Sequence, residues 1–164
     1  MRRGCYIGVV GPSDATPQLE RLAYEVGERL ARAECVLVCG GLGGVMAAAC
    51  RGAFGAGGLT VGLLPQKRRG AENEYLSVAI PTGLGELRNG LIVRSSDAVV
   101  AIGGSWGTLS EIALAIRTGK PVVAMRSWQP VTETHQQVFG GPAVAGDVAE
   151  LFAFLERVLQ SADG

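Results

Sequence analysis

Two glycine clusters, each between a short apolar run and a segment with helical spacing, constrain the fold more than any other feature of the sequence. The first cluster, residues 40–44, follows the apolar run 35–39. The second cluster, residues 103–107, follows the predicted strand 97–102, which is apolar from Ala98 onward. A strand that ends in glycines and leads into a helix is the repeating unit of parallel α/β proteins. The two clusters therefore predict an α/β fold.

The rest of the chain continues this alternation. Thr16-Pro17 predicts a helix start, with threonine at the N-cap and proline at the first helical position. Strands are predicted at residues 5–10, 35–39, 59–64, 77–80, 97–102 and 121–125, and helices from Pro17 onward and at residues 45–54, 84–96, 108–117 and 147–159. The strands are apolar throughout, as expected when helices cover both sheet faces. We therefore expect one Rossmann-like domain, residues 1–164, with a doubly wound, mostly parallel sheet.

Length and charge limit the classes of partner. The chain has 164 residues, 48% of them hydrophobic and 18% charged, which fits one folded core rather than a disordered chain. Lysine plus arginine equals aspartate plus glutamate at 15 each, so no overall field attracts nucleic acid or an acidic membrane. No apolar run is long enough to span a membrane, and the first residues have no signal-peptide pattern. We expect a cytoplasmic protein without nucleic-acid or membrane partners.

The cysteines and the single histidine do not predict a metal site. Cys5, Cys35, Cys39 and Cys50 lie in apolar segments without a CxxC pair, and we expect reduced, small core residues. His135 is distant from all four cysteines in sequence, which argues against zinc. Neither a GxxxxGK[ST] loop nor a GxGxxG fingerprint is present, which argues against triphosphate and dinucleotide sites. We therefore expect no metal and no cofactor.

The glycine clusters are the predicted ligand site, because open parallel sheets bind ligands at the carboxyl ends of their strands. Glycines leave the backbone bare, and the free amides and positive dipole of the following helix favour a phosphate. The alternative is that these glycines only form tight turns. The predicted ligand-binding residues are Gly11, Ser13, Gly40, Gly41, Gly43, Gly44, Met46, Asn89, Gly103, Gly104, Ser105, Trp106, Gly107 and Thr108.

Glu111 and Arg88 are the charged groups predicted for this site. Residues 108–111 match a capping box with Thr108 at the N-cap, so Glu111 either caps the helix or directs its carboxylate into the pocket near a bound sugar. Arg88 lies early in the preceding predicted helix, where the alternative is an ordinary surface arginine. Asn89 beside it can donate to a hydroxyl or a base edge. Trp106 either stacks on a ligand ring or closes the core.

Short motifs at these positions carry a family resemblance. Residues 40–46 read GGLGGVM, and residues 103–111 read GGSWGTLSE, with Arg88 before them. This pattern resembles the GGGxxGLM, R-K and PGGxGTxxE motifs of the Lonely guy family, at the same separation. The resemblance covers roughly residues 5–125. Many members of that family are nucleoside 5′-monophosphate phosphoribohydrolases that release cytokinin bases.

The resemblance implies a function, and the departures from it imply another. If catalysis is retained, Arg88 and Glu111 correspond to the hydrolytic pair, and residues 104–108 correspond to the phosphate loop. Asn89, however, stands where the family has lysine, and Gly103 stands where its second motif opens with proline. In these departures the chain is similar to the related branch that includes molybdenum cofactor carrier proteins, which bind a phosphorylated pterin. The resemblance also implies a homo-oligomer, a dimer or a tetramer.

Three functions stay open from the sequence. The first is a binding or carrier protein for a phosphorylated nucleotide-like or pterin-type ligand, such as a nucleoside monophosphate or a pterin phosphate. The second is an enzyme that cleaves the N-glycosidic bond of a nucleoside 5′-monophosphate. The third is a structural or regulatory protein in which the glycine clusters hold an anion only incidentally.

Overall fold

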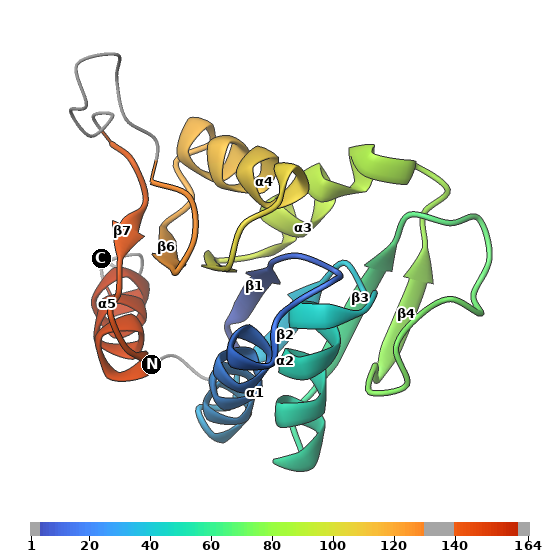
Figure 1. Cartoon of the computed structure of the whole chain (residues 1–164), viewed down its shortest axis with the longest axis horizontal. Helices are drawn as coiled ribbons and strands as arrows, with labels where there is room; N and C mark the ends of the chain where they lie inside the picture. The colour runs from blue at the N-terminus through green and yellow to red at the C-terminus, as the bar shows by residue number, and fades with distance from the viewer. Residues whose placement is uncertain (1–3, 130–139, 161–164) are drawn as a thin grey trace.

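The computed structural model describes residues 4–129 and 140–160, which fold around one parallel β-sheet (Figure 1). Its strands are β1 (Tyr6–Val10), β2 (Val36–Cys39), β3 (Thr60–Leu64), β4 (Val78–Pro81), β5 (Ala98–Ile102), β6 (Val122–Met125) and β7 (Ala143–Val144). They lie in the order β4-β3-β2-β1-β5-β6-β7, and every neighbouring pair is parallel. The expected α/β fold is confirmed.

Helices cover both faces of this sheet. They are α1 (Pro17–Arg32), α2 (Gly44–Gly55), α3 (Asn89–Ser95), α4 (Trp106–Arg117) and α5 (Val148–Gln160), with a 3-10 helix, η1 (Gly85–Arg88), directly before α3. Figure 1 shows α1, α2 and α5 on one side of the strands and α3 and α4 on the other. A buried apolar cluster lies under each group, with Leu30 and Leu155 in the larger cluster and Ile92 and Ile112 in the smaller. The doubly wound arrangement is therefore confirmed as well.

The order of the strands reverses at β1, which pairs with β2 on one side and with β5 on the other. The connection after β1 leads to α1, and the connection after β5 leads to α4 on the opposite face. Connections that diverge in this way open a crevice at the carboxyl ends of the two strands. Both glycine clusters and the Gly11 turn follow strands that end at this edge.

The start of α1 was predicted correctly, and the start of α4 was not. Thr16 Oγ1 accepts a hydrogen bond from the amide of Leu19 at 3.4 Å, with Pro17 at the first helical position. Helix α4, however, begins at Trp106, because Ser105 has the extended backbone of an N-cap and its Oγ accepts from the amide of Thr108 at 3.2 Å. The predicted capping box with Thr108 at the N-cap is therefore wrong.

Three further details differ from the expectation. The predicted helix 84–96 consists of η1 followed by the short helix α3, and β7 lies between the predicted strand 121–125 and the predicted helix 147–159, where no strand was expected. Cys5 and Cys35 form a disulfide rather than remaining reduced, because β1 and β2 pair with Tyr6 opposite Val36 and bring the preceding cysteines within a Cα–Cα distance of 4.8 Å. His135 lies outside the described residues.

None of the helices in residues 4–129 and 140–160 has the length and hydropathy needed to cross a bilayer. The same residues contain no group of three or more histidine, cysteine, aspartate or glutamate side chains arranged to hold a metal ion. The expectation of a protein without metal or cofactor stays a prediction.

Candidate functional site

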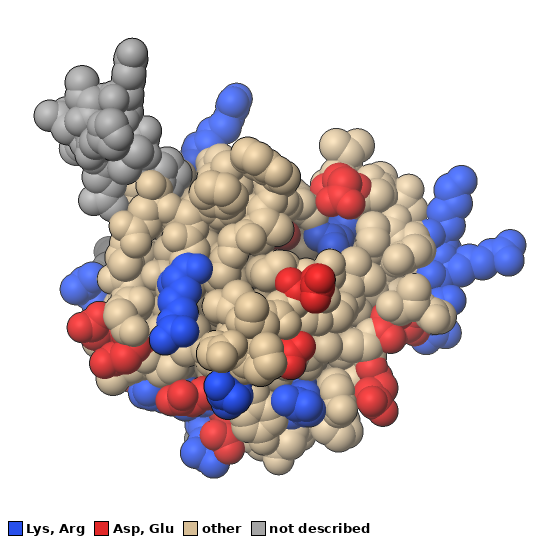
Figure 2. All heavy atoms as spheres, viewed as in Figure 1, with Lys and Arg blue, Asp and Glu red and all other residues tan. Residues whose placement is uncertain are grey.

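An open pocket lies at the carboxyl ends of β1, β2 and β5, with an empty volume, including its open mouth, of ≈ 590 Å³. Figure 2 shows this face of the molecule hollowed near its centre, with acidic and basic side chains in the hollow. Ten predicted site residues line the pocket: Gly11, Ser13, Gly40, Met46, Arg88, Asn89, Ser105, Gly107, Thr108 and Glu111. The structure thus brings parts of both glycine clusters to one cavity.

The first glycine cluster leads into α2 without a side-chain cap. Gly43 is the N-cap residue, and no side chain accepts a hydrogen bond from the first turn. The amide of Val45 donates to the carbonyl of Pro12 at 3.1 Å, which ties this turn to the loop after β1. The other amides of a first helical turn have no acceptor within the helix. Backbone donors at this end of α2 are therefore available to an anion.

The second cluster begins α4 with a partial cap. Ser105 Oγ accepts from the Thr108 amide at 3.2 Å and lies 2.9 Å from Thr108 Oγ1. This leaves the amides of Trp106 and Gly107 without acceptors inside the helix. Gly107 lines the pocket, and a Cβ there would lie 3.7 Å from Ser105 Oγ. The start of α4 therefore presents both hydroxyl and amide donors.

Packing accounts for several of the glycines that line or border the pocket. A Cβ at Gly40 would lie 2.4 Å from Nη2 of Arg88, so this glycine makes room for the guanidinium. A Cβ at Gly11 would lie 2.5 Å from the carbonyl oxygen of Ile102. Gly44 has φ +55°, and a Cβ there would lie 2.4 Å from the carbonyl of Pro12. These glycines are needed for close approach between loops whether or not a ligand binds.

The remaining predicted glycines do not line the pocket. Gly41, with φ +74°, faces Leu64, and Gly43 borders Ser13. Gly103, with φ +67°, turns the chain after β5 against Leu19. The structure therefore gives these positions a turn-forming role, and any contact with a ligand there stays a prediction.

Gly104 and Trp106 also lie away from the pocket lining. Trp128 occupies the space beside Gly104, and its Nε1 donates to the carbonyl of Ser105 at 2.9 Å. Trp106 is 78% exposed and stacks on Trp128, with ring centroids 5.6 Å apart. Trp106 thus does not close the core, which was one of the two alternatives, and its stacking on a ligand ring stays a prediction.

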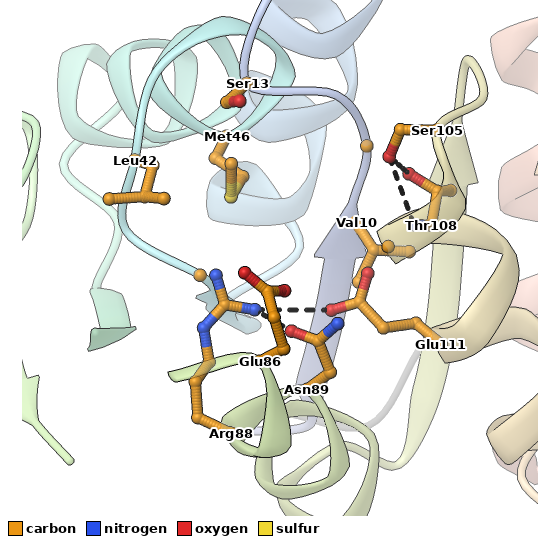
Figure 3. A pocket seen from close by; sticks show the side chains of 13 residues that line it. Val10, Ser13, Leu42, Met46, Glu86, Arg88, Asn89, Ser105, Thr108 and Glu111 are labelled. Carbon is orange, nitrogen blue, oxygen red and sulfur yellow. Dashed lines mark hydrogen bonds and ion pairs between the residues drawn. The ribbon is translucent and has the colours of Figure 1, made fainter. Parts of the chain in front are cut away.

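Arg88 and Glu111 meet at the floor of the pocket, where Figure 3 shows their side chains directed toward each other. Arg88 Nη1 lies 3.7 Å from Glu111 Oε1, and the side chains are only 8% and 6% exposed. The same Nη1 donates to Asn89 Oδ1, whose Nδ2 in turn donates to Ser110 Oγ at 3.3 Å. Arg88 Nε is buried without a hydrogen-bond partner among the described residues. Arg88 is thus a buried side chain that interacts with Glu111 and Asn89, and not a surface arginine.

Burial raises the pKa of Glu111 to about 7, although the Arg88 guanidinium opposes this shift and Glu86 adds to it. The carboxyl group therefore exchanges its proton near neutral pH. A group with this property can act as an acid or a base, or can adjust its charge to that of a bound anion.

Three pocket residues were missed by sequence reasoning: Val10, Leu42 and Glu86. Glu86 lies in η1, two residues before Arg88, and its exposed side chain is labelled at the pocket wall in Figure 3. The i, i+2 spacing to Arg88 within a predicted helix gave no reason to place both on one face. Leu42 stands between the two glycine pairs of the first cluster, so of the three residues it is the one that the sequence could most easily have indicated.

Two free thiols lie close to the first cluster. Cys39 Sγ and Cys50 Sγ are 3.5 Å apart and buried, and the amide of Gly41 donates to Cys39 Sγ at 3.3 Å. The hydrogen bond from Cys50 lowers the pKa of Cys39 and raises that of Cys50. The thiols do not line the pocket, and they pack between β2 and α2.

The sequence model of the SLOG cluster4 family matches residues 4–148 of the chain. A relative from Archaeoglobus fulgidus, itself uncharacterised, is 43% identical over 139 residues, which make up 85% of this chain and 90% of the relative.

Two solved structures are similar along nearly the whole chain. The molybdenum cofactor binding protein from the phototrophic bacterium Rippkaea orientalis has a TM-score of 0.87 and 36% sequence identity, with 97% of this chain and 99% of that chain covered. The molybdenum cofactor carrier protein from Chlamydomonas reinhardtii has a TM-score of 0.83 and 34% identity, with 95% of this chain and 99% of that chain covered.

Proposed function

The chain belongs to the SLOG cluster4 family, and on this basis we propose that it binds and carries a phosphorylated pterin of the molybdenum cofactor type. The observation that carries the proposal is that Gly40 and Gly107, one from each glycine cluster, border the same pocket. The likeness to the carrier proteins of Rippkaea orientalis and Chlamydomonas reinhardtii supports this choice of ligand. The expected Lonely guy-like resemblance agrees with the family assignment.

In this proposal the start of α4 holds the phosphate. Ser105 and Thr108 supply hydroxyl groups, and the first-turn amides supply backbone donors. A helix start also carries a positive partial charge that favours an anion by about 0.3–1 kcal/mol, more where it is partly buried. The uncapped start of α2 adds a second set of donors from the facing wall.

The apolar residues of the pocket contact the ring of the ligand. Val10, Leu42 and Met46 line the same cavity as the donors, and Figure 3 shows Leu42 and Met46 projecting into it from the first cluster and α2. A flexible thioether such as that of Met46 adapts well to flat aromatic surfaces. The pocket thus offers an anion site next to an apolar surface, as a phosphorylated heterocycle requires.

The proposal is tested by thermal unfolding with and without a phosphorylated pterin. A ligand at a hundred times its dissociation constant adds about 2.7 kcal/mol to the stability of the folded protein. Gly107→Ala is the informative variant, because its Cβ enters the pocket in ordinary contact with Ser105 Oγ and Asn89 Nδ2 and does not strain the fold. We expect the wild type to be stabilised by the ligand and Gly107→Ala to be stabilised much less.

The matched control is Gly55→Ala. Gly55 also lies in a helix, α2, and its Cβ would meet only Tyr24 at 3.7 Å, outside the pocket. This variant should respond to the ligand like the wild type. Equal responses from all three proteins would overturn the placement of the ligand, and no response from any of them would overturn the carrier function.

A second candidate function is the cleavage of the N-glycosidic bond of a nucleoside 5′-monophosphate. One observation favours it: Glu111, with a pKa of about 7, lies beside Arg88 in the pocket. Glu111 would then stabilise the positive charge that develops on the ribose, and Arg88 would orient the sugar. Incubation with AMP, followed by measurement of free base and ribose 5-phosphate, tests this function. Release that is no higher in the wild type than in Glu111→Gln would remove it.

We further propose that the chain forms a homo-oligomer, a dimer or a tetramer. Exposed apolar side chains on and next to β4, η1 and α3 support this, since each of the following is between 40% and 80% exposed: Val78, Ile80, Leu84, Leu87 and Leu91. Sedimentation velocity measures the assembly directly. Replacement of Leu87, the most exposed of the five, by glutamate should shift the population toward the monomer, and a wild type that sediments as a monomer would contradict the proposal.

A further inference from the structure

Glu86 is the one acidic group of the pocket wall without a partner. It lies in η1, is exposed, and lines the pocket. Its carboxylate has neither a hydrogen bond nor a salt bridge with any residue in the described ranges 4–129 and 140–160. Glu111, by contrast, is buried against Arg88. Glu86 is therefore free to accept hydrogen bonds from a ligand.

The hydroxyl groups of Ser13 and Ser105 lie on a different wall of the pocket from Glu86. Figure 3 shows Glu86 beside Arg88 and Asn89 on one wall, with Ser13 and Ser105 across the cavity. A phosphate is held by donors, so it belongs on the side of Ser105 and the start of α4. A carboxylate accepts hydrogen bonds and repels anions, so Glu86 must face a different part of the same ligand, one that carries N–H groups.

Carboxylates discriminate sharply among heterocyclic rings. A 2-amino-4-oxopyrimidine edge, present in guanine and in pterins, places an amino group beside a ring N–H, so that one carboxylate accepts both hydrogen bonds in parallel. Adenine and cytosine instead place their amino group beside an unprotonated ring nitrogen, which is an acceptor and opposes the carboxylate. Parallel, charge-assisted pairs of this kind combine geometric specificity with strength.

We propose that Glu86 selects ligands with a 2-amino-4-oxopyrimidine ring, by accepting two hydrogen bonds from the amino group and the adjacent ring N–H. This inference rests on the proposed binding of a phosphorylated heterocycle in the pocket. Leu42 and Met46 contact the faces of the ring, and Glu86 reads its edge. The competing explanation is that the exposed Glu86 carboxylate only keeps the pocket mouth hydrated. Comparison of GMP with IMP distinguishes this explanation from recognition of the ring.

The test compares GMP with IMP, which differ only in the 2-amino group, by isothermal titration calorimetry. One charge-assisted hydrogen bond corresponds to about 10- to 100-fold in affinity. We expect the wild type to bind GMP about 10- to 100-fold more tightly than IMP and to bind AMP more weakly than either. In Glu86→Ala the GMP-to-IMP ratio should fall to about one. Because Glu86 is exposed, this variant should fold normally.

Glu74→Ala is the control, since Glu74 is also an exposed glutamate and lies outside the pocket. It should keep the wild-type ratio. Ribose 5-phosphate, which has no ring base, is titrated as well. If ribose 5-phosphate and both nucleotides bind but GMP and IMP bind equally, the role of Glu86 is overturned and the phosphate pocket stands. If none of the three binds, the inference is overturned, and the proposed function falls with it only if the protein also gives no thermal response to a phosphorylated pterin.

Discussion

Arg88 Nη1 lies 3.7 Å from Glu111 Oε1, and both side chains are more than nine-tenths buried, at 8% and 6% exposed. Burial of the carboxyl outweighs the attraction of the guanidinium, so the pKa of Glu111 rises from 4.5 to about 7. The charge of the pocket floor therefore changes near neutral pH. This pair links the stability of the fold to the chemistry of the site.

We expect Glu111→Gln to remove part of the pH dependence of stability. Because the pKa of Glu111 is higher in the folded than in the unfolded chain, the folded protein binds more protons between pH 4.5 and 7, and its stability falls as the pH rises through that window. The full shift corresponds to about 3 kcal/mol. The free energy of unfolding of Glu111→Gln, measured in urea relative to the wild type, should therefore rise by about 2–3 kcal/mol when the pH is raised from about 5 to about 8.

Glu74→Gln is the control for this measurement, because Glu74 is exposed and does not line the pocket. Its difference from the wild type should be the same at both pH values. A difference between Glu111→Gln and the wild type that also stays constant would mean that Glu111 ionises like an ordinary surface carboxyl.

Gly40→Ala should destabilise the protein through Arg88. A Cβ at Gly40 would lie 2.4 Å from Nη2 and 2.8 Å from Cζ of Arg88, so the guanidinium would have to leave its place beside Glu111. We expect a loss of about 1–3 kcal/mol in the free energy of unfolding. Gly107→Ala, whose Cβ has no contact closer than 3.7 Å, should lose much less. Urea unfolding measures both, and a Gly40→Ala variant as stable as Gly107→Ala would contradict the role assigned to Gly40.

The fold followed from the sequence because its signals are local. Apolar runs, glycine clusters and the Thr16-Pro17 helix start each depend on neighbouring residues, and together they predict a doubly wound sheet. The meeting of residues from both clusters at one pocket followed as well, since all strands are parallel and their carboxyl ends share an edge.

The details that escaped prediction depend on contacts between distant segments. The Cys5–Cys35 disulfide requires the register of β1 against β2, which no local pattern contains. The start of α4 at Trp106 follows from the turn at Gly103, which places Ser105 in the extended conformation of an N-cap. Glu86 was missed because it stands two residues before Arg88, and residues at that spacing do not share a face of the predicted helix.

Thiol counting tests the cysteine arrangement. Cys39 and Cys50 are free and buried, and Cys5 and Cys35 are paired. A thiol reagent such as DTNB should react slowly with the folded protein and should find two thiols after unfolding without reductant. After reduction it should find all four cysteines of the sequence. Four reactive thiols in the unreduced, unfolded protein would exclude the disulfide.

Reduction of this disulfide should also lower the stability of the fold. The bond joins residues separated by 30 positions, and closing a loop of that length restricts the unfolded chain by about 2–4 kcal/mol. Urea unfolding with and without reductant measures the difference. The double variant Cys5→Ala/Cys35→Ala should show the lower stability with or without reductant, and a reductant effect that persists in it would assign the loss to another cause.

Asn89→Lys introduces the lysine of the Lonely guy motif, and we expect it to destabilise this protein. Asn89 is 8% exposed, its Oδ1 accepts from Arg88 Nη1, and its Nδ2 donates to Ser110 Oγ. A lysine would remove the acceptor and place a second buried cation beside Arg88. We expect a loss of about 3 kcal/mol or more in the free energy of unfolding. A second cation would also hold the pKa of Glu111 below its wild-type value, which weakens the pH dependence described above.

Asn89→Met separates charge from lost hydrogen bonds, because methionine has a similar length and no charge. Asn89→Met should lower the free energy of unfolding by about 1–2 kcal/mol. The difference between the two variants, measured by urea unfolding at neutral pH, then gives the effect of the added charge. If Asn89→Lys is as stable as Asn89→Met, the lysine side chain must reach the solvent-filled part of the pocket. The departure at Asn89 would then present no structural barrier to hydrolysis, and release of free base from AMP by Asn89→Lys, compared with the wild type, would measure whether the lysine alone restores activity.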